Sequence, residues 1–268
     1  LVAKEIPLIV EKLAAAFWPG PLTLVLPKQP HVPASVTAGL DSVAVRIPSH
    51  PVALALIRAS GVPIAAPSAN RFGHTSPTTA HHVMDDLNGR IDMILDGGAT
   101  SVGVESTVLD ITCTPPMLLR PGGVSREAIE QVIGAVELRN NRPNSEEEAQ
   151  VSPGLLGKHY TPNAELILCK GEKDSALEKL AELAKQAQAE GRSVGLLLAN
   201  EDMASFESCV PYPLGSSTDL EAIARNLYAG MRELDDQGVN LILTRDFGKQ
   251  GLGLAIHDRL LRAASQII

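Results

Sequence analysis

The feature that most constrains how this chain can fold is a break in its sequence pattern near the middle. Residues 138–161 show neither helical nor strand periodicity and are rich in Asn, Pro, Glu and Gly, a composition typical of a linker between domains. On both sides of this segment, apolar residues recur with the spacings of strands and helices. The pattern therefore predicts two domains, residues 1–137 and 162–268, joined by the linker 138–161.

The two halves predict different kinds of α/β domain. In the first half, strands and helices follow one another without strict alternation, which favours a mixed twisted sheet with helices. After the linker, strands and helices alternate, which favours a smaller, doubly wound, Rossmann-like domain. The predicted strands are 22–27, 42–48, 63–70, 91–98, 105–112, 116–123, 165–170, 193–200, 210–215 and 240–246, and the predicted helices are 4–17, 51–60, 78–87, 125–134, 173–190, 218–236 and 252–266.

Composition excludes several classes of protein. The chain has 268 residues, of which 44% are hydrophobic, so it can bury a core and is not globally disordered. No run approaches the ~20 apolar residues of a membrane-spanning helix, and the charged first residues do not resemble a signal peptide. The net charge of −8 gives no general attraction for nucleic acid, although a local basic groove could still bind RNA weakly. Three cysteines without a CxxC pair argue against a disulfide framework or thiolate zinc site and favour the cytoplasm.

Polar side chains stand where predicted strands of the first half end. Arg46, Ser68, Asn70 and Arg120 each follow an apolar stretch. Ligands of open α/β sheets bind at strand ends, and two guanidinium groups with a hydroxyl and an amide suit a multiply charged oxyanion such as phosphate or carboxylate. The competing interpretation is that the arginines form structural ion pairs and that residues 68–70 are an ordinary turn.

Three further residues strengthen the binding-site interpretation. Thr78 lies at a predicted helix start, where backbone N–H groups favour phosphate. Ser106 lies at the mouth of a strand, and Ser42 precedes Arg46 by four residues, so that the two side chains share one face of a strand. Together these residues predict an anion-binding site.

Other motifs are weaker. Residues 154–158 lack the spacing of a phosphate loop, and Gly251 and Gly253 lack the rest of a dinucleotide fingerprint. His81 and His82 are adjacent on a predicted helix and diverge, so they cannot share a metal ion. The neighbouring Asp85–Asp86 pair is interpreted as a solvated helix face. The sequence assigns no catalytic residue of the covalent or acid–base kind.

The ordered segments of the chain closely resemble the YrdC-like family, in its two-domain threonylcarbamoyl-AMP synthase branch. The resemblance covers nearly the whole chain. It rests on FWPGPLTLVLP, VAVRIPSHPVALALI, GVPIAAPSANRFGHTSPTTAHHV, ILDGG, GVESTVLD, LLRPGGV, SPGLLGKHYTPNAEL and GLGLAIHDRLLRAA.

This resemblance implies a nucleotidyltransferase that joins L-threonine, bicarbonate and ATP, with Mg²⁺, into threonylcarbamoyl-AMP and releases pyrophosphate. Partner proteins would then transfer the threonylcarbamoyl group to tRNA. The implied ATP contacts are Ser42, Asn70, Thr78, Arg120 and Tyr160. The implied threonine contacts are Arg46 on the carboxylate, Ser68 and Ser106, and linker residues around Lys158, His159 and Tyr160 would close over the pocket.

One departure from the family concerns the start of the chain. The family's N-terminal segment, with a Thr-Glu-Thr-Val-Tyr-Gly stretch and a Lys-x-Arg motif, does not precede these blocks, which predicts impaired activity for the chain as it stands. The alternatives to a threonylcarbamoyl-AMP synthase are a non-catalytic RNA-binding module, a regulatory nucleotide sensor and a carbamoyl-transferring maturation factor of the same fold. The last of these carries zinc-binding CxxC pairs that this chain lacks.

Overall fold

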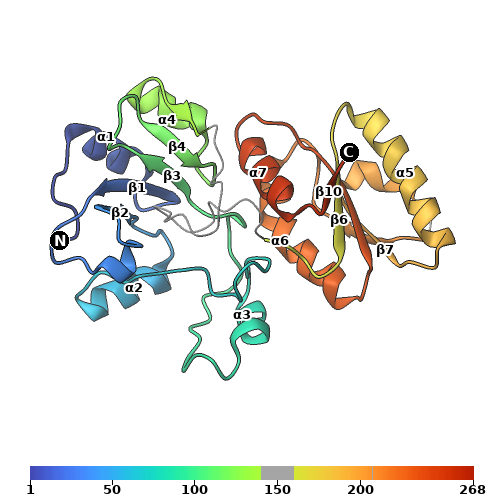
Figure 1. Ribbon diagram of the computed structural model, residues 1–268, viewed down its shortest axis with the longest axis horizontal. Helices are drawn as coiled ribbons and strands as arrows, with labels where there is room; N and C mark the ends of the chain where they lie inside the picture. Colours follow the sequence, from blue (N-terminus) through green and yellow to red (C-terminus); the bar gives the residue numbers. More distant parts are fainter. Residues whose placement is uncertain (140–159, 207) are drawn as a thin grey trace. The chain divides into compact units, whose positions relative to one another are not determined.

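The computed structural model describes residues 1–139, 160–206 and 208–268 and divides them between two compact units. Among these residues, the first unit holds 1–68 and 105–139, and the second holds 69–104 and 160–268. The elements of both units are labelled in Figure 1. Nearly all of the predicted linker, and the 154–158 motif, lie outside the described residues, so the domain limits at 137 and 162 stay a prediction.

The first unit contains a mixed five-stranded sheet in the order β2-β1-β3-β4-β5. Pairing is antiparallel for β1 with β2 and for β3 with β4, and parallel for β1 with β3 and for β4 with β5. This confirms the predicted mixed sheet. The strands are β1 (Leu22–Pro27), β2 (Ser42–Val45), β3 (Thr107–Asp110), β4 (Met117–Arg120) and β5 (Glu137–Leu138).

Local sequence explains where the helices of the first unit begin and end. A proline opens α2, and Gly61 ends it in the left-handed conformation that glycine adopts without strain. The Ser125 side chain caps α4 by accepting a hydrogen bond from the Ala128 N–H. The helices of this unit are α1 (Leu8–Phe17), α2 (Pro51–Ser60), α4 (Arg126–Ile133) and the single 3₁₀ turn η1 (Ala34–Val36).

Two predicted strands of the N-terminal half do not form. Residues 63–70 and 91–98 have no regular structure, and apolar side chains in these segments, such as Ile64 and Met93, are exposed. A strand needs a neighbour to receive its backbone hydrogen bonds, and no described strand pairs with either segment. The predicted strands are therefore wrong, because an apolar pattern does not show whether a pairing strand is present.

The second unit contains a parallel five-stranded sheet in the order β10-β6-β9-β7-β8. The predicted Rossmann-like character is confirmed. Its strands are β6 (Glu165–Cys169), β7 (Val194–Leu198), β8 (Val210–Pro213), β9 (Leu241–Arg245) and β10 (Gln266–Ile267). Its helices in this C-terminal part are α5 (Lys173–Ala189), α6 (Leu220–Asp236), α7 (Gly253–Ala263) and the 3₁₀ segment η2 (Asn200–Ser205).

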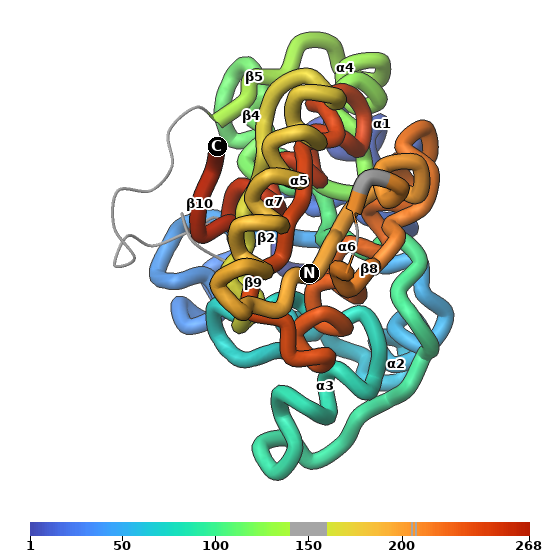
Figure 2. The backbone as a smooth tube through the Cα atoms, turned by 90° about the vertical axis from the view of Figure 1, so that its right-hand side faces the viewer, coloured from blue at the N-terminus to red at the C-terminus, as the bar shows by residue number. Residues whose placement is uncertain are grey.

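Both faces of this parallel sheet are covered by helices. Alternate residues of β6 point to opposite faces, so Leu166 and Leu168 pack with α6 and α7, whereas Ile167 and Cys169 pack with α5. Figures 1 and 2 show α5 on one side of the strands and α6 with α7 on the other. None of the helices that the structure describes is long and apolar enough to cross a membrane.

A segment from the N-terminal half belongs to the second unit. Residues 69–104, which include α3 (Ala80–Leu87), group with the C-terminal sheet and its helices. Val104 packs in the same core cluster as the buried residues of α6. Gly103 has a φ of +79°, and a Cβ there would lie 2.2 Å from the Cα of Arg225, so the close approach of this segment to α6 requires glycine.

Candidate active site

Two of the predicted site residues are joined directly in the first unit. Arg120, the last residue of β4, donates hydrogen bonds from Nη2 to the carbonyl oxygen (3.0 Å) and the Oγ (3.2 Å) of Ser106, and its Nε donates to the same carbonyl at 3.2 Å. Both residues are 6% exposed. The antiparallel pairing of β3 and β4 brings them together, because Ser106 immediately precedes β3.

Thr23 is a site residue that sequence reasoning missed. Its Oγ1 lies 2.7 Å from the Oγ of Ser106, and both side chains are buried. The contact arises because β1 runs parallel to β3, with Leu22 opposite Thr107. Only the strand order could have revealed it, since 83 residues separate the two hydroxyls.

Gly122 allows the turn after Arg120 to lie directly against the backbone beside Ser106. A Cβ at this position would come within 2.3 Å of the Glu105 carbonyl oxygen and 2.4 Å of the Ser106 carbonyl carbon. The turn is fixed further by Thr107, whose Oγ1 donates to the Val124 carbonyl at 2.6 Å. The absence of a side chain at Gly122 therefore permits the close approach of the turn after Arg120 to the backbone of Ser106.

Arg46 lies close enough to Arg120 for the two positive charges to interact. Partial burial and the charge of Arg120 both lower the pKa of Arg46, although much of its side chain remains open to solvent. No hydrogen bond or ion pair joins Arg46 to another residue in the described part of the chain. Two guanidinium groups that repel each other in this way are stabilised by a bound anion such as a carboxylate or phosphate.

The other predicted site residues of the first unit, Ser42 and Ser68, have no described contact with Arg46, Ser106 or Arg120. Ser42 begins β2, opposite Pro27 of β1. Ser68 is exposed at the end of the segment that was expected to form a strand. The structure thus brings together Arg46, Ser106 and Arg120, while no contact of Ser42 or Ser68 with them is described.

Asn70 and Thr78 belong to the second unit. The Nδ2 of Asn70 donates to the carbonyls of Arg71 (2.9 Å) and His74 (3.1 Å), which shapes the loop, while its Oδ1 has no partner among the described residues. Both the backbone N–H and the Oγ1 of Thr78 lie 3.2 Å from Nδ1 of His82. Because the N–H donates, that nitrogen is an acceptor and the imidazole is neutral.

The electrostatic surroundings favour this neutral form. Burial and the positive charge of Arg232 lower the pKa of His82, whereas Asp85 and Asp236 raise it by a smaller amount. The N–H of His82 donates in turn to Oγ1 of Thr79, and this hydrogen bond caps the start of α3. The loop before α3 is therefore locked onto the first turn of the helix.

Tyr160 is buried in the core of the second unit. Its ring centroid lies 5.4 Å from that of Tyr228, and the guanidinium of Arg259 lies over it at 5.2 Å. Its carbonyl accepts a hydrogen bond from Oγ1 of Thr75 at 3.3 Å. Contact of Tyr160 with ATP stays a prediction, and Lys158 and His159 lie outside the described residues.

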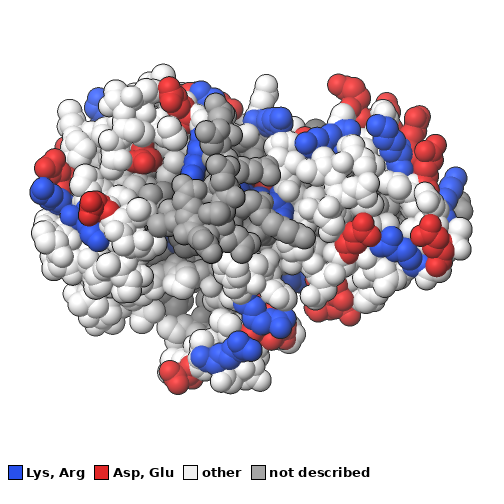
Figure 3. All heavy atoms as spheres, viewed as in Figure 1, with Lys and Arg blue, Asp and Glu red and all other residues white. Residues whose placement is uncertain are grey.

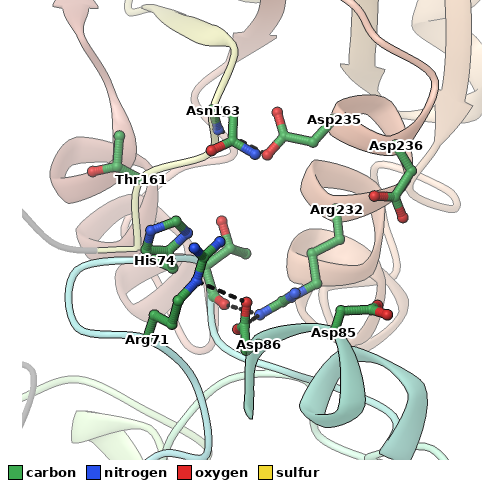
Figure 4. A pocket seen from close by; sticks show the side chains of 10 residues that line it. Arg71, His74, Asp85, Asp86, Thr161, Asn163, Arg232, Asp235 and Asp236 are labelled. Atoms are coloured by element: carbon green, nitrogen blue, oxygen red, sulfur yellow. Dashed lines mark hydrogen bonds and ion pairs between the residues drawn. The ribbon is translucent and has the colours of Figure 1, made fainter. Parts of the chain in front are cut away.

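The prediction of a solvated Asp85–Asp86 face is wrong for Asp86. That carboxylate is buried and pairs with Arg232, because α3 packs this side of its surface against α6, whereas Asp85 is exposed. Both aspartates line a cavity of about 120 Å³ within the second unit (Figure 4). The cavity is lined by Arg71, His74, Thr75, Asp85, Asp86, Thr161, Asn163, Arg232, Asp235 and Asp236.

The distribution of charged and metal-ligating side chains bears on nucleic-acid binding and on metal binding. Over the face shown in Figure 3, outside the grey atoms, basic and acidic side chains are interspersed rather than gathered into one basic patch. Within the described ranges, no three His, Cys, Asp or Glu side chains form a group that could hold a metal ion.

Two family models match consecutive parts of the chain, and the boundary between them falls just after β4. Residues 1–122 match a family described as "Telomere recombination", the Sua5, YciO and YrdC group, and residues 124–265 match "Threonylcarbamoyl-AMP synthase, C-terminal domain". Fold and matches together define a two-domain protein with a YrdC-like part and a Sua5 C-terminal domain.

Individual relatives agree over nearly the whole chain. A threonylcarbamoyl-AMP synthase of Pyrococcus abyssi is 47% identical over 98% of this chain and 76% of its own length, and that of Bacillus subtilis is 46% identical over 94% and 72%. The crystal structure of P. abyssi Sua5 complexed with L-threonine superposes with a TM-score of 0.91 and 46% identity, covering 99% of this chain and 77% of that one. The chain belongs to the threonylcarbamoyl-AMP synthase family, and it is an enzyme of the nucleotidyltransferase type; a non-catalytic binding module is not favoured.

Proposed function

We propose that the chain joins L-threonine, bicarbonate and ATP into threonylcarbamoyl-AMP and releases pyrophosphate, in the service of tRNA modification. The observation that carries this proposal is the group formed by Arg46, Arg120 and Ser106, in which two guanidinium groups lie close together beside a serine hydroxyl. Threonine bound by P. abyssi Sua5 supports the choice of an amino acid carboxylate as the anion.

Arg46 is the better candidate for the threonine carboxylate. No described residue engages its guanidinium, which leaves a planar pair of donors for the two carboxylate oxygens. Arg120 is anchored on Ser106, so it acts as a fixed positive charge rather than as a movable clamp. The Thr23 and Ser106 hydroxyls lie beside it and can accept or donate a hydrogen bond to the amino acid side chain.

The reaction requires positioning and charge stabilisation more than a protein nucleophile. The neutral amino group of threonine first combines with bicarbonate, forming the C–N bond of a carbamate and releasing water. A carbamate oxygen then attacks the α-phosphorus of ATP, and the bond to the departing pyrophosphate breaks. Both partners of that second step are anions, and their repulsion amounts to several kcal/mol at an effective dielectric constant of about 20. Arg46 and Arg120 would offset this repulsion, and the step needs no covalent intermediate with the protein.

The remaining partners follow from the chemistry of ATP and of the product. Mg²⁺ would be supplied together with ATP, where it would draw charge from the pyrophosphate leaving group. Ser42, Asn70 and Thr78 are proposed to contact ATP, with Ser68 assigned to threonine. The product is a reactive acyl-phosphate that downstream threonylcarbamoyl-transfer proteins would consume in the cytoplasm.

The test is pyrophosphate release measured with the chain, ATP, Mg²⁺, bicarbonate and L-threonine, together with calorimetric titration of threonine. We expect pyrophosphate release that depends on the presence of every substrate. We also expect the chain to bind threonine. The control variant Arg58→Ala, which removes an exposed arginine of α2, should bind threonine with unchanged affinity. Salt-dependent RNA binding without threonine binding or pyrophosphate release would overturn the proposal in favour of an RNA-binding module.

A further inference from the structure

The loop and helix that carry Asn70 and Thr78 are held by one arginine of the C-terminal domain. Arg232 of α6 donates from Nη2 to Oδ2 of Asp86 at 2.5 Å and to the carbonyl of Thr75 at 2.6 Å. Its Nε lies 3.4 Å from the Ser76 carbonyl oxygen. One guanidinium therefore fastens both α3 and the loop that precedes it to α6, across about 150 residues of sequence.

The contact is buried and consists of charge-assisted hydrogen bonds. The side chains of Arg232 and Asp86 are 12% and 5% exposed. Arg71 approaches the other oxygen of Asp86 at 3.7 Å, and its side chain is half exposed. Figure 4 shows the three groups converging at one side of the cavity. Breaking one partner of such a pair leaves an uncompensated buried charge, which is costly, so the arrangement is strongly preferred.

The same arginine acts on the residue that holds Thr78. The positive charge of Arg232 favours the neutral form of His82, and the neutral imidazole accepts the Thr78 N–H hydrogen bond. Thr75, Ser76 and Thr78 are thus fixed within one short stretch, the first two by their carbonyls and the third through His82.

We propose that Arg232 is a positioning residue of the enzyme, which sets the conformation of residues 70–86 and thereby the affinity for ATP. The proposal rests on the assignment of Asn70 and Thr78 to ATP in the proposed function. It gives the C-terminal domain a task, namely to order a nucleotide-binding segment that originates in the N-terminal half of the sequence. Arg232 itself need not touch the nucleotide.

The test compares Arg232→Ala with Arg225→Ala, which removes an exposed arginine from the same helix. Calorimetry on the full chain should show ATP bound about tenfold more weakly by Arg232→Ala, a loss of about 1.4 kcal/mol, with threonine affinity changed less than about twofold. Amide hydrogen exchange should become faster in residues 74–87 and stay unchanged in β1 and β3. Arg225→Ala should behave as the unsubstituted chain.

Two milder variants keep the proposal testable if Arg232→Ala does not fold. Arg232→Lys keeps the charge but lacks the planar fork that reaches Asp86 and Thr75 together, so partial recovery of ATP affinity is expected. Asp86→Asn should also lower the affinity for ATP, as Arg232→Ala does. Unchanged exchange in residues 74–87, or equal losses of ATP and threonine affinity, would overturn the positioning role. Failure of the unsubstituted chain to bind ATP would instead refute the proposed function, whatever the exchange data show.

Discussion

Two arginines of the second unit and one arginine of the first unit have opposite electrostatic surroundings. In the second unit, Arg232 and Arg245 each pair with a buried aspartate, Asp86 and Asp202. In the first unit, Arg46 has no carboxylate partner among the described residues and instead lies near a second positive charge. Where the chain supplies the counter-charge, an arginine joins elements of the fold. Where it does not, the charge is available for a ligand, at some cost to the protein without it.

The largest expected effect is on the paired side of this comparison. Asp202 of η2 is 1% exposed, and its carboxylate accepts from Nε of Arg245 at 2.7 Å while Nζ of Lys173 lies 3.0 Å away. These residues join the connections that follow β6, β7 and β9 at one end of the parallel sheet. Asp202→Ala leaves the buried Arg245 without its anion and should lower the free energy of unfolding by about 3–5 kcal/mol.

Urea denaturation followed by circular dichroism measures this loss, with Glu178→Ala on the exposed face of α5 as the control. A midpoint for Asp202→Ala equal to that of the control would mean that Arg245 is not held by Asp202. In that case the pairing of an arginine with a buried aspartate would not predict its contribution to the free energy of unfolding.

The next effect is on the unpaired side. Arg46→Ala should weaken threonine binding about a hundredfold, or about 2.7 kcal/mol, because a charged bidentate contact is lost. The affinity of this variant for ATP should fall much less. Its stability should not fall and can rise slightly, since the repulsion of Arg120 disappears. Parallel calorimetric titrations with threonine and ATP check the first expectation, and urea denaturation checks the second. Equal losses for the two ligands would count against the assignment of Arg46 to the carboxylate.

Local sequence was sufficient for most elements of the fold. Alternation and turn residues predicted β1, β3 and β4, and the proline at α2 and the serine before α4 located two helix starts. The segments 63–70 and 91–98 were wrong as strands because strand formation depends on a neighbour that periodicity does not reveal. The backbone hydrogen bonds of a helix, by contrast, form within one segment of the chain.

The site was partly predictable for the same reason. Arg46, Ser106 and Arg120 could be found because each stands at a strand end, which is a local feature. Thr23 and Arg232 could not, since one depends on the order of strands and the other on a contact between α3 and α6. Asp86 was misassigned because a polar residue on a helix is expected to be solvated unless its partner is known.

The smallest effect concerns pH and sharpens the comparison, because it tests how a paired arginine influences a neighbour. Burial, followed by the positive charges of Arg232 and His81, lowers the pKa of His82, whereas Asp85 and Asp236 raise it. The lowered pKa means that the folded protein resists protonation of this imidazole.

Below the ordinary pKa of about 6.5, the unfolded chain binds a proton that the folded chain does not, so stability falls as the pH decreases toward the folded pKa. Above that range the stabilising contribution of neutral His82 is fully present.

NMR titration of the His82 ring, with hydrogen exchange of residues 74–87 from pH 7.5 to 5, should show protonation below the ordinary range and loss of protection at acidic pH. His82→Gln keeps an amide oxygen that can accept the Thr78 N–H bond but does not titrate, so it should flatten the pH dependence of exchange. A pH profile identical to that of the unsubstituted chain would assign the effect to another group, whereas a flat profile would show that the neutral imidazole holds Thr78 in place.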